Sequence, residues 1–329
     1  MPTEYIKIDK LNPEPDLIEH AANLLRQGEL VAFPTETVYG LGALAFLPGA
    51  AEKIFIAKER PGGNPLLVHL SNVKQIEELA LEIPQEALLL IEAFWPGPLS
   101  IILPARAEVP RAVTGGLPGV GLRMPDHPVA LALIEAAGPI AAPSANSSGR
   151  PSPLTAEHVQ ADLDGRIAAV LDGGSTGVGV ESTIIDLCQR PYRIIRIGGV
   201  SVPSLEDILQ QSVVLAENEN TRLPHYQTGS RVVYCVSEED LIDKMDYYRS
   251  QGRLTAVVNN RWTGLKTTGD VGHYELTLDA GGSNLYAILR KAEEDGREVV
   301  LFAPLADDSD DMAAAVIDRI KKSARPSEG

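Results

Sequence analysis

The stretch FPTETVYGLG, residues 33–42, decides how the first two thirds of the sequence is interpreted. It follows an apolar run, residues 30–33, that is typical of a buried β-strand, and Pro34 ends that run. Two threonine hydroxyls, a carboxylate and two glycines come after the proline. Gly40 and Gly42 taken alone are typical of a tight turn, whereas the hydroxyls beside them favour a functional site at the end of a strand.

A second polar stretch, PSANSSGRPSP at residues 143–153, has the same design. An apolar run at residues 139–142 is predicted to be a strand, and a proline, hydroxyls and a glycine follow it, as in the first stretch. We therefore expect the two strand ends to contribute polar groups to one site.

Length and patterning predict an α/β fold with two domains. A chain of 329 residues is long for a single core, since domains average about 150 residues. Residues 1–211 are predicted to form one α/β domain, because helical and strand patterns alternate along them. Residues 212–229 lose this periodicity and become polar, so we interpret them as a linker. Residues 230–329 resume the alternation and predict a smaller, Rossmann-like α/β domain; no GxGxxG motif assigns it a dinucleotide.

Apolar periodicity and capping residues predict the individual elements. In the first domain, helices are expected at residues 16–27, 51–59, 85–95, 129–137, 155–163 and 202–211. Strands are expected there at residues 30–33, 66–70, 99–103, 120–124, 139–142, 167–171, 183–187 and 194–197. In the second domain, strands are expected at residues 231–236, 254–258, 274–278 and 299–302, and helices at residues 237–250, 284–294 and 311–324.

Composition argues against several classes of protein. No apolar run of about 18 residues is present, and the first residues lack a basic stretch followed by an apolar one. We therefore predict neither a membrane span nor a signal peptide and expect a cytoplasmic protein. Cys188 and Cys235 lie far apart without a CxxC motif, which argues against a zinc site or a disulfide framework. The formal net charge of −16 argues against nucleic-acid binding over the whole surface but leaves a local basic pocket open.

Four cations occupy unusual positions. Lys58 and Arg60 lie two residues apart at the end of a predicted helix, just before a proline and two glycines. Arg123 and Arg196 each lie inside an apolar strand, where a buried charge is costly unless it meets an anion. Together the four favour an anionic ligand, and the arginine fork suits phosphate or carboxylate groups.

Short hydroxyl and amide side chains accompany the cations and could donate to phosphate oxygens alongside glycine amides. The set comprises Thr35, Thr37, Ser144, Asn146, Ser152 and Ser182. Neither a P-loop motif nor a GxSxG motif is present, which argues against a P-loop NTPase and a serine hydrolase. Among the histidines we assign His69 to the site, because it lies on a predicted buried strand shortly after the cations. The acidic residues 307–311 are interpreted as a solvated loop before the last helix rather than as metal ligands.

These motifs, in this order, resemble those of the YrdC-like domain of L-threonylcarbamoyladenylate synthases. The matching motifs are PTETVYGLG at 34–42, KxRPxxNPL at 58–66 with His69, Arg123 before PDHP at 125–128, PSANxSG at 143–149 with Ser152, and EST at 181–183. The resemblance covers roughly residues 10–210, and the linker with the second domain resembles the two-domain members of the family.

The resemblance implies a YrdC-like fold and a nucleotidyltransferase that converts L-threonine, bicarbonate or CO2, and ATP into threonylcarbamoyl-AMP and pyrophosphate. The product supports threonylcarbamoyl modification of adenosine in tRNA through a downstream tRNA threonylcarbamoyl transferase complex; direct contact with tRNA stays open. By resemblance, threonine is held by Thr37, His69, Arg123, Ser182 and the backbone of Ala142. ATP is held by Lys58, Arg60, Asn64, Ser144, Asn146, Ser152 and Arg196, with Lys58 and Arg60 as the catalytic cations and Tyr226 added from the linker.

The chemistry of these residue types agrees with that assignment. The amine of threonine adds to CO2, and the resulting N-carboxylate attacks the α-phosphorus of ATP and expels pyrophosphate. Such a step needs positioning and charge neutralisation more than a side-chain nucleophile. A Mg²⁺ ion carried by the pyrophosphate is expected, and no carboxylate cluster in the sequence is assigned to bind it.

Two alternatives and one departure from the family pattern stay open at the level of sequence. An enzyme that forms a carbamoyl-adenylate from carbamoyl phosphate usually carries zinc-binding modules, for which two cysteines are too few. An RNA-binding module is disfavoured by the net negative charge. In the linker, LPHY at residues 223–226 is followed by QT, whereas the family commonly has Ala-Pro after His-Tyr.

Overall fold

The computed structural model describes residues 2–216, 226–260, 271–279, 282–305 and 311–324. It divides into two compact units, which are described separately: residues 1–148 with 152–218, and residues 149–151 with 219–329. The predictions for residues 217–225 of the linker and residues 306–310 of the acidic loop lie outside the described residues.

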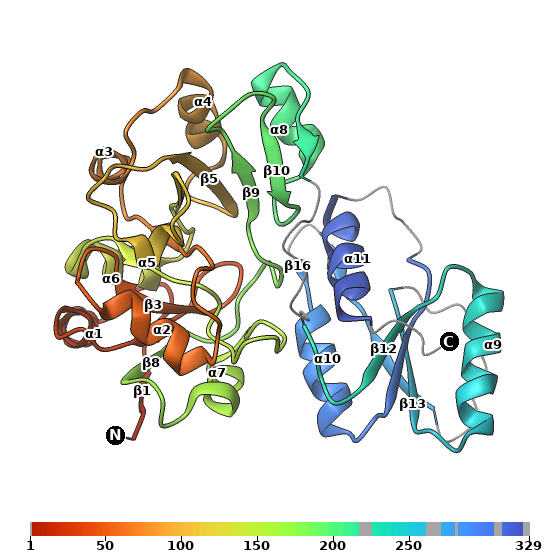
Figure 1. Cartoon of the computed structure of the whole chain (residues 1–329). Helices are drawn as coiled ribbons and strands as arrows, with labels where there is room; N and C mark the ends of the chain where they lie inside the picture. The colour runs from red at the N-terminus through yellow and green to blue at the C-terminus, as the bar shows by residue number, and fades with distance from the viewer. Residues whose placement is uncertain (1, 217–225, 261–270, 280–281, 306–310, 325–329) are drawn as a thin grey trace. The chain divides into compact units, whose positions relative to one another are not determined.

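A mixed sheet of eleven strands organises the described part of the first unit (Figure 1). Its order is β1-β8-β2-β3-β7-β4-β6-β5-β9-β10-β11. The strands are β1 Glu4–Lys7, β2 Val31–Phe33, β3 Gly40–Leu44, β4 Leu67–His69, β5 Leu99–Pro104, β6 Gly119–Arg123, β7 Ile140–Ala141, β8 Ala169–Asp172, β9 Thr183–Asp186, β10 Arg193–Arg196 and β11 Val214–Leu215. The helices are α1 Pro15–Arg26, α2 Ala50–Lys58, α3 Ile76–Leu79, α4 Gln85–Phe94, α5 Arg111–Thr114, α6 Pro128–Ala137, α7 Ala156–Leu163 and α8 Val202–Leu209, with a 3-10 turn at Val73–Gln75.

Both faces of the central strands are buried, which explains their nearly continuous apolar sequence. Along β2, the side chains of Val31 and Phe33 join a core cluster with α1 and α6, whereas Ala32 joins the larger cluster on the other face. Alternate residues of a strand point to opposite faces, so one short apolar run serves two cores. The predicted helix at 16–27 and strand at 30–33 are thereby confirmed with shifts of one residue at their ends.

Gly40 and Gly42 lie in a strand, which corrects their interpretation as a turn. β3 pairs antiparallel with β2, with Val31 opposite Gly42. A Cβ atom on Gly42 would lie 2.8 Å from Cγ2 of Ile140 and 2.9 Å from Cε1 of Phe33, well inside normal contact. Glycine is needed here because neighbouring side chains pack against the bare backbone, a requirement that local turn statistics do not capture.

We expect Gly42→Ala to destabilise the first unit by about 1–3 kcal/mol, the usual cost of overpacking a core. The matched control is Gly62→Ala, since a Cβ on Gly62 meets no atom within 4 Å. Urea unfolding curves should show a lower midpoint for Gly42→Ala and an unchanged or slightly higher one for Gly62→Ala. Equal midpoints for the two variants would show that Gly42 is not required for packing.

The order and register of the interior strands bring several candidate residues together. β4 lies between β7 and β6, and its pairing with β6 is parallel, so His69 is in register with Arg123. β5 joins β6 to β9, which begins directly after Ser182. The ends of β4 and β6 and the start of β9 therefore lie near one another, whereas Ala142 follows β7, which runs antiparallel to β4.

The second unit contains a parallel sheet of four strands in the order β12-β17-β13-β14, within the described residues. Its elements are β12 Arg231–Tyr234, α9 Glu238–Ser250, β13 Thr255–Asn259, β14 Gly272–Glu275, the hairpin β15 Leu278–Asp279 and β16 Gly282–Ser283, α10 Leu285–Glu294, β17 Val299–Phe302 and α11 Asp311–Ser323. Ser237 caps α9 by accepting a hydrogen bond of 3.1 Å from the backbone amide of Asp240, as its sequence predicts. The Rossmann-like prediction is confirmed.

Several boundaries differ from those predicted, and two of the differences change the assignment of a strand. The strand expected at residues 274–278 is divided: β14 ends at Glu275, and Leu278 begins β15. Val214–Leu215, placed at the start of the predicted linker, forms β11 and pairs in parallel with β10. A strand of two residues at the edge of a sheet is too short to show an alternating apolar pattern, so the sequence does not predict β11. In the described residues, no helix is both long and apolar enough to cross a membrane.

Candidate functional site

The two polar stretches lie against each other, as the sequence predicts. The backbone amide of Leu41 donates to the carbonyl of Pro143 over 2.8 Å, and that of Ala145 donates to the carbonyl of Tyr39 over 2.8 Å. Gly40 and Ser144 form an isolated antiparallel bridge between them. The strand ends at residues 33 and 142 therefore deliver their hydroxyls to one place.

Lys58 is buried and fastens the second polar stretch to helix α2. Its ammonium group donates to the backbone carbonyls of Ser144 and Asn146, and its own carbonyl accepts from the amide of Ser148 over 2.8 Å. Burial, together with the nearby charge of Arg60, lowers the pKa of Lys58 to about 7. Two of the three N–H donors of Lys58 therefore bond the loop at residues 144–146 and hold it in position. The sequence did not indicate this role.

Arg60 and Arg196 lie close enough to repel each other. Burial lowers the pKa of Arg60, and the charge of Arg196 lowers it further. Arg196 is held by Ser182, since its Nε donates to the backbone carbonyl over 2.9 Å and its Nη2 to the hydroxyl over 3.1 Å. A buried guanidinium group under the influence of a second positive charge favours a nearby anion, because an anion would offset the repulsion.

Arg123 is the most enclosed of the candidate arginines, with 4% of its side chain exposed. Its Nε donates to the carbonyl of Gly97 over 3.2 Å. Its Nη2 lies 2.7 Å from Oε1 of Glu36, whose side chain is 13% exposed. The two atoms form an ion pair without the angles of a normal hydrogen bond, so both retain unused bonding capacity.

His69 lies beside Arg123 and is neutral at neutral pH. Burial lowers its pKa to about 3, and the positive charge of Arg123 adds to the shift. Its Nδ1 is buried without a hydrogen bond of normal geometry, although the backbone of Leu67 and Ile140 interacts with the ring. The ring meets that of Phe33 edge to face at 6.1 Å. A neutral imidazole can donate or accept one hydrogen bond without adding a charge to the site.

The depressed pKa of His69 predicts a stability that falls in acid. Between pH 6.5 and about 3 the unfolded state binds a proton at this residue that the folded state excludes, so unfolding becomes easier as pH falls. We expect His69→Gln to reduce this dependence, by up to about 1.4 kcal/mol per pH unit within that window. Urea unfolding at pH 7 and pH 5 measures it, with exposed His20→Gln as the control. An unchanged slope in His69→Gln would contradict the assignment.

The hydroxyl groups are largely committed to one another. Thr35 and Thr37 have their hydroxyl oxygens 2.9 Å apart, and both side chains are buried. Ser144 donates to Oδ1 of Asn146 over 2.5 Å. Ser152, from the end of the second stretch, donates to Oε1 of Glu181 over 2.6 Å. The backbone amide of Ala142 donates to the carbonyl of Leu67, so it is not available to a ligand. The carbonyl of Ala142 is the backbone group that a ligand would contact.

One segment joins the two groups of cations. The carbonyl of Gly97 accepts from Arg123, and the carbonyl of Pro98 accepts from the backbone amide of Thr183, directly after Ser182. Ser100 follows on β5, and its hydroxyl lies 2.8 Å from that of Ser182. Arg123 on one side and Arg196 on the other therefore share a short, directly bonded connection.

Two predicted ATP-binding residues make contacts outside this cluster. Asn64 lies in the loop after α2, where its side-chain amide donates to the carbonyl of Pro61 over 3.1 Å. Tyr226 belongs to the second unit, where its ring stacks on that of Tyr286 at 5.1 Å and faces the guanidinium of Arg319 at 5.8 Å. Their roles toward ATP stay predictions.

Two carboxylates were not assigned to the site from sequence, namely Glu36 and Glu181. Each lies inside a motif that was quoted for its other residues, PTET and EST. Glu36 pairs with Arg123, and Glu181 accepts from Ser152. The available signal was that an acidic residue within an otherwise buried motif needs a cationic or hydroxyl partner.

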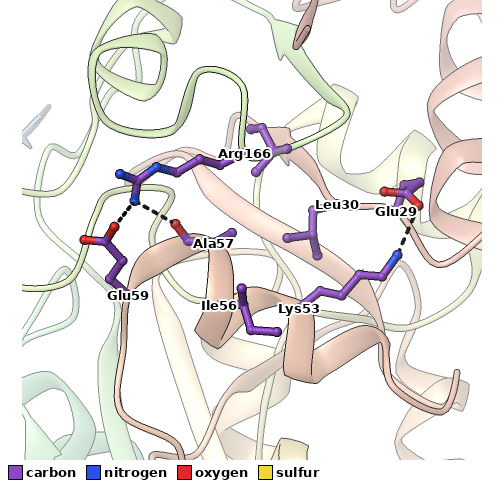
Figure 2. A pocket seen from close by; sticks show the side chains of 8 residues that line it. Glu29, Leu30, Lys53, Ile56, Ala57, Glu59 and Arg166 are labelled. Atoms are coloured by element: carbon purple, nitrogen blue, oxygen red, sulfur yellow. Dashed lines mark hydrogen bonds and ion pairs between the residues drawn. The ribbon is translucent and has the colours of Figure 1, made fainter. Parts of the chain in front are cut away.

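A pocket elsewhere on the first unit contains none of the predicted site residues. Figure 2 shows its lining of Glu29, Leu30, Lys53, Ile56, Ala57, Glu59 and Arg166, with Ile167. Its charges are paired, since Lys53 lies 3.0 Å from Glu29 and Arg166 lies 2.8 Å from Glu59. In the ranges that the structure describes, no three His, Cys, Asp or Glu side chains gather in a way that could hold a metal ion.

Comparison with known proteins agrees with the fold and the motifs. The family profile described as "Telomere recombination" matches residues 23–198, and the profile of the threonylcarbamoyl-AMP synthase C-terminal domain matches residues 200–325. A threonylcarbamoyl-AMP synthase of Pyrococcus abyssi is 39% identical over 323 residues, covering 93% of this chain and 94% of the relative. That of Bacillus subtilis is 39% identical over 332 residues, covering 96% and 95%.

A solved structure extends the similarity to three dimensions. The crystal structure of Pyrococcus abyssi Sua5 complexed with L-threonine superposes with a TM-score of 0.89 at 37% identity, covering 98% of each chain. The Escherichia coli protein YciO matches with a TM-score of 0.55 at 26% identity, covering 60% of this chain and 96% of its own. Because the similarity to the first protein spans both units, the chain belongs to the threonylcarbamoyl-AMP synthase family.

Proposed function

We propose that the chain forms threonylcarbamoyl-AMP and pyrophosphate from L-threonine, bicarbonate or CO2, and ATP. The observation that carries this proposal is the pair of cationic sites joined through residues 97–100: Arg123 at one end, and Arg60 with Arg196 at the other. An amino-acid carboxylate needs the first site, and a triphosphate needs the second. The relatives with this name support the same reaction.

We assign the residues to the two substrates as the sequence predicts. Threonine is proposed to bind Thr37, His69, Arg123, Ser182 and the carbonyl of Ala142. ATP is proposed to bind Lys58, Arg60, Asn64, Ser144, Asn146, Ser152, Arg196 and Tyr226. The contact between Ser182 and Arg196 supports a shared boundary, because one hydroxyl can touch the amino acid while its arginine partner reaches the phosphates.

The proposed reaction needs no side-chain nucleophile. The site holds the N-carboxylate of threonine against the α-phosphorus, and Arg60 and Arg196 neutralise the charge that develops on the phosphates. Mg²⁺ would enter with ATP, where it neutralises the departing pyrophosphate. The described side chains offer it hydroxyl and amide oxygens but no carboxylate cluster, so we assign it no protein ligand.

We propose residues 1–211 as the catalytic domain, residues 212–229 as a linker and residues 230–329 as the second domain. We propose that the product passes to a tRNA threonylcarbamoyl transferase complex and that the reaction takes place in the cytoplasm. The net charge of −16 supports transfer of a small product rather than direct binding of tRNA through the general surface.

Release of pyrophosphate from ATP tests the proposal. Wild-type protein should release it only when threonine and bicarbonate are both present, and mass spectrometry should detect threonylcarbamoyl-AMP. Release that depends on carbamoyl phosphate instead would identify a carbamoyl-adenylate-forming enzyme. Retention of RNA without turnover would identify an RNA-binding module.

A further inference from the structure

Buried polar atoms of three residues in the threonine half of the site lack a hydrogen-bond partner. Oε2 of Glu36 and Nδ1 of His69 have none, and Oε1 of Glu36 and Nη2 of Arg123 meet only as an ion pair. A buried polar atom without a hydrogen bond destabilises the fold, and most such atoms in folded proteins are satisfied. Several of them at one point indicate that a polar ligand completes their bonding.

The arrangement of charges matches one class of ligand. Glu36 carries a negative charge 2.7 Å from the positive Nη2 of Arg123, and both side chains are enclosed by protein. An α-amino acid has a carboxylate and an ammonium group on the same carbon, so it can meet both partners at once. His69 is neutral and does not compete with the arginine as a cation.

We propose that Glu36 binds the α-ammonium group of threonine and accepts the proton that this group must lose before it attacks CO2. This inference rests on the proposed function and deepens it. Arg123 holds the substrate carboxylate, and Glu36, released from its contact with Nη2, turns to the adjacent ammonium. The sequence alone assigned this residue no role.

The step balances without a further reagent. An N–H bond of the ammonium group breaks, its electron pair stays on nitrogen, and the proton passes to a carboxylate oxygen of Glu36. The neutral amine then forms an N–C bond to CO2 while the electron pair of one C=O π bond moves onto oxygen. A second proton leaves nitrogen for water, and Glu36 later releases its own proton to water. The product is the N-carboxylate that attacks ATP.

The other ionisable groups near Glu36 are weaker candidates for this base. Arg123 on β6 cannot accept a proton at neutral pH. His127, at the start of α6, interacts electrostatically with Glu36 and Lys10, but its Nδ1 accepts from the backbone amide of Val129 over 3.2 Å. His69 is neutral, because burial lowers its pKa to about 3, so it lacks the negative charge that attracts an ammonium group.

The test compares Glu36→Gln with wild type by pyrophosphate release as threonine and pH are varied. General-base catalysis is typically worth 10²-fold or more, so we expect kcat/KM for threonine to fall about 10²-fold near pH 7. The loss should shrink toward pH 9, because more of the dissolved threonine then carries a neutral amine. Glu36→Asp keeps the charge and should show a smaller loss with the wild-type pH profile. Glu29→Gln removes a carboxylate that pairs with Lys53 and is the matched control.

A binding measurement tests the contact between Glu36 and the ammonium group independently of catalysis. Calorimetry should show that wild type binds threonine more tightly than 3-hydroxybutyrate, which lacks the ammonium group, and that Glu36→Gln loses this preference. Preference retained in Glu36→Gln, or an equal activity loss at every pH, would overturn the inference. A wild-type protein that binds threonine selectively but releases no pyrophosphate would instead count against the proposed function. Thermal unfolding establishes that each variant is folded. If Glu36→Gln does not fold, the comparison is made with Glu36→Asp instead.

Discussion

Arg123→Ala should abolish most use of threonine while leaving the binding of ATP nearly intact. Arg123 is 4% exposed and proposed to meet the substrate carboxylate in a site closed to water. Removing one partner of a buried charge pair costs about 2–5 kcal/mol, which corresponds to a loss of about 10³-fold in kcat/KM for threonine. The alanine variant also leaves Glu36 as an uncompensated buried charge, which would repel the incoming carboxylate.

The measurement needs two readouts and a control. Pyrophosphate release gives kcat/KM for threonine, and calorimetry with a non-hydrolysable ATP analogue gives nucleotide affinity in the absence of threonine. Arg193→Ala removes an exposed arginine from the edge-side strand β10 and should behave as wild type. Equal losses for threonine and nucleotide in Arg123→Ala would show that this arginine supports the whole site rather than the amino acid.

The elements were predictable where a buried face leaves a repeating pattern in the sequence. Helices α1, α6 and α10 begin and end within two residues of their predicted limits, because apolar spacing and capping residues report burial directly. The glycines of β3 were interpreted as a turn, because glycine is common in turns. In the structure, glycine is needed at position 42 because Phe33 and Ile140 approach the backbone there. Such a constraint comes from residues about 10 and 100 positions away, and no local pattern contains it.

The site was predictable as a set of motifs, but the partners within it were not. A polar stretch directly after a strand predicts that its hydroxyl groups belong to a site. The backbone hydrogen bonds between residues 39–41 and 143–145 confirm that the two polar stretches lie together. Which cation meets which group depends on the order of strands. Lys58 was assigned to phosphate alone, yet it also donates to two carbonyls of the loop at residues 144–146. Glu36 received no role, although it is the ion-pair partner of Arg123.

Lys58→Met should lower kcat/KM for ATP about 10³-fold and leave the binding of threonine within a few-fold of wild type. The variant removes a charge from the phosphate half of the site, and loss of one such preorganised donor costs about 10²- to 10³-fold. It also removes both hydrogen bonds that hold the carbonyls of Ser144 and Asn146, so the loop loses its geometry. Threonine affinity, measured by calorimetry without nucleotide, tests whether the damage is confined to the ATP half.

The pKa of Lys58 supplies a second and more specific test of the same residue. Burial and Arg60 lower it to about 7 in the free protein, so the ammonium loses its proton as pH rises through that value. Because kcat/KM reports the ionisation of the free enzyme, wild-type kcat/KM for ATP should fall above about pH 7. Lys58→Arg keeps a positive charge at every accessible pH but fits the buried position less well, so its activity should be lower and that descending limb should be absent. A descending limb that persists in Lys58→Arg would assign the ionisation to another group, and Lys58 would then act through the loop at residues 144–146 alone.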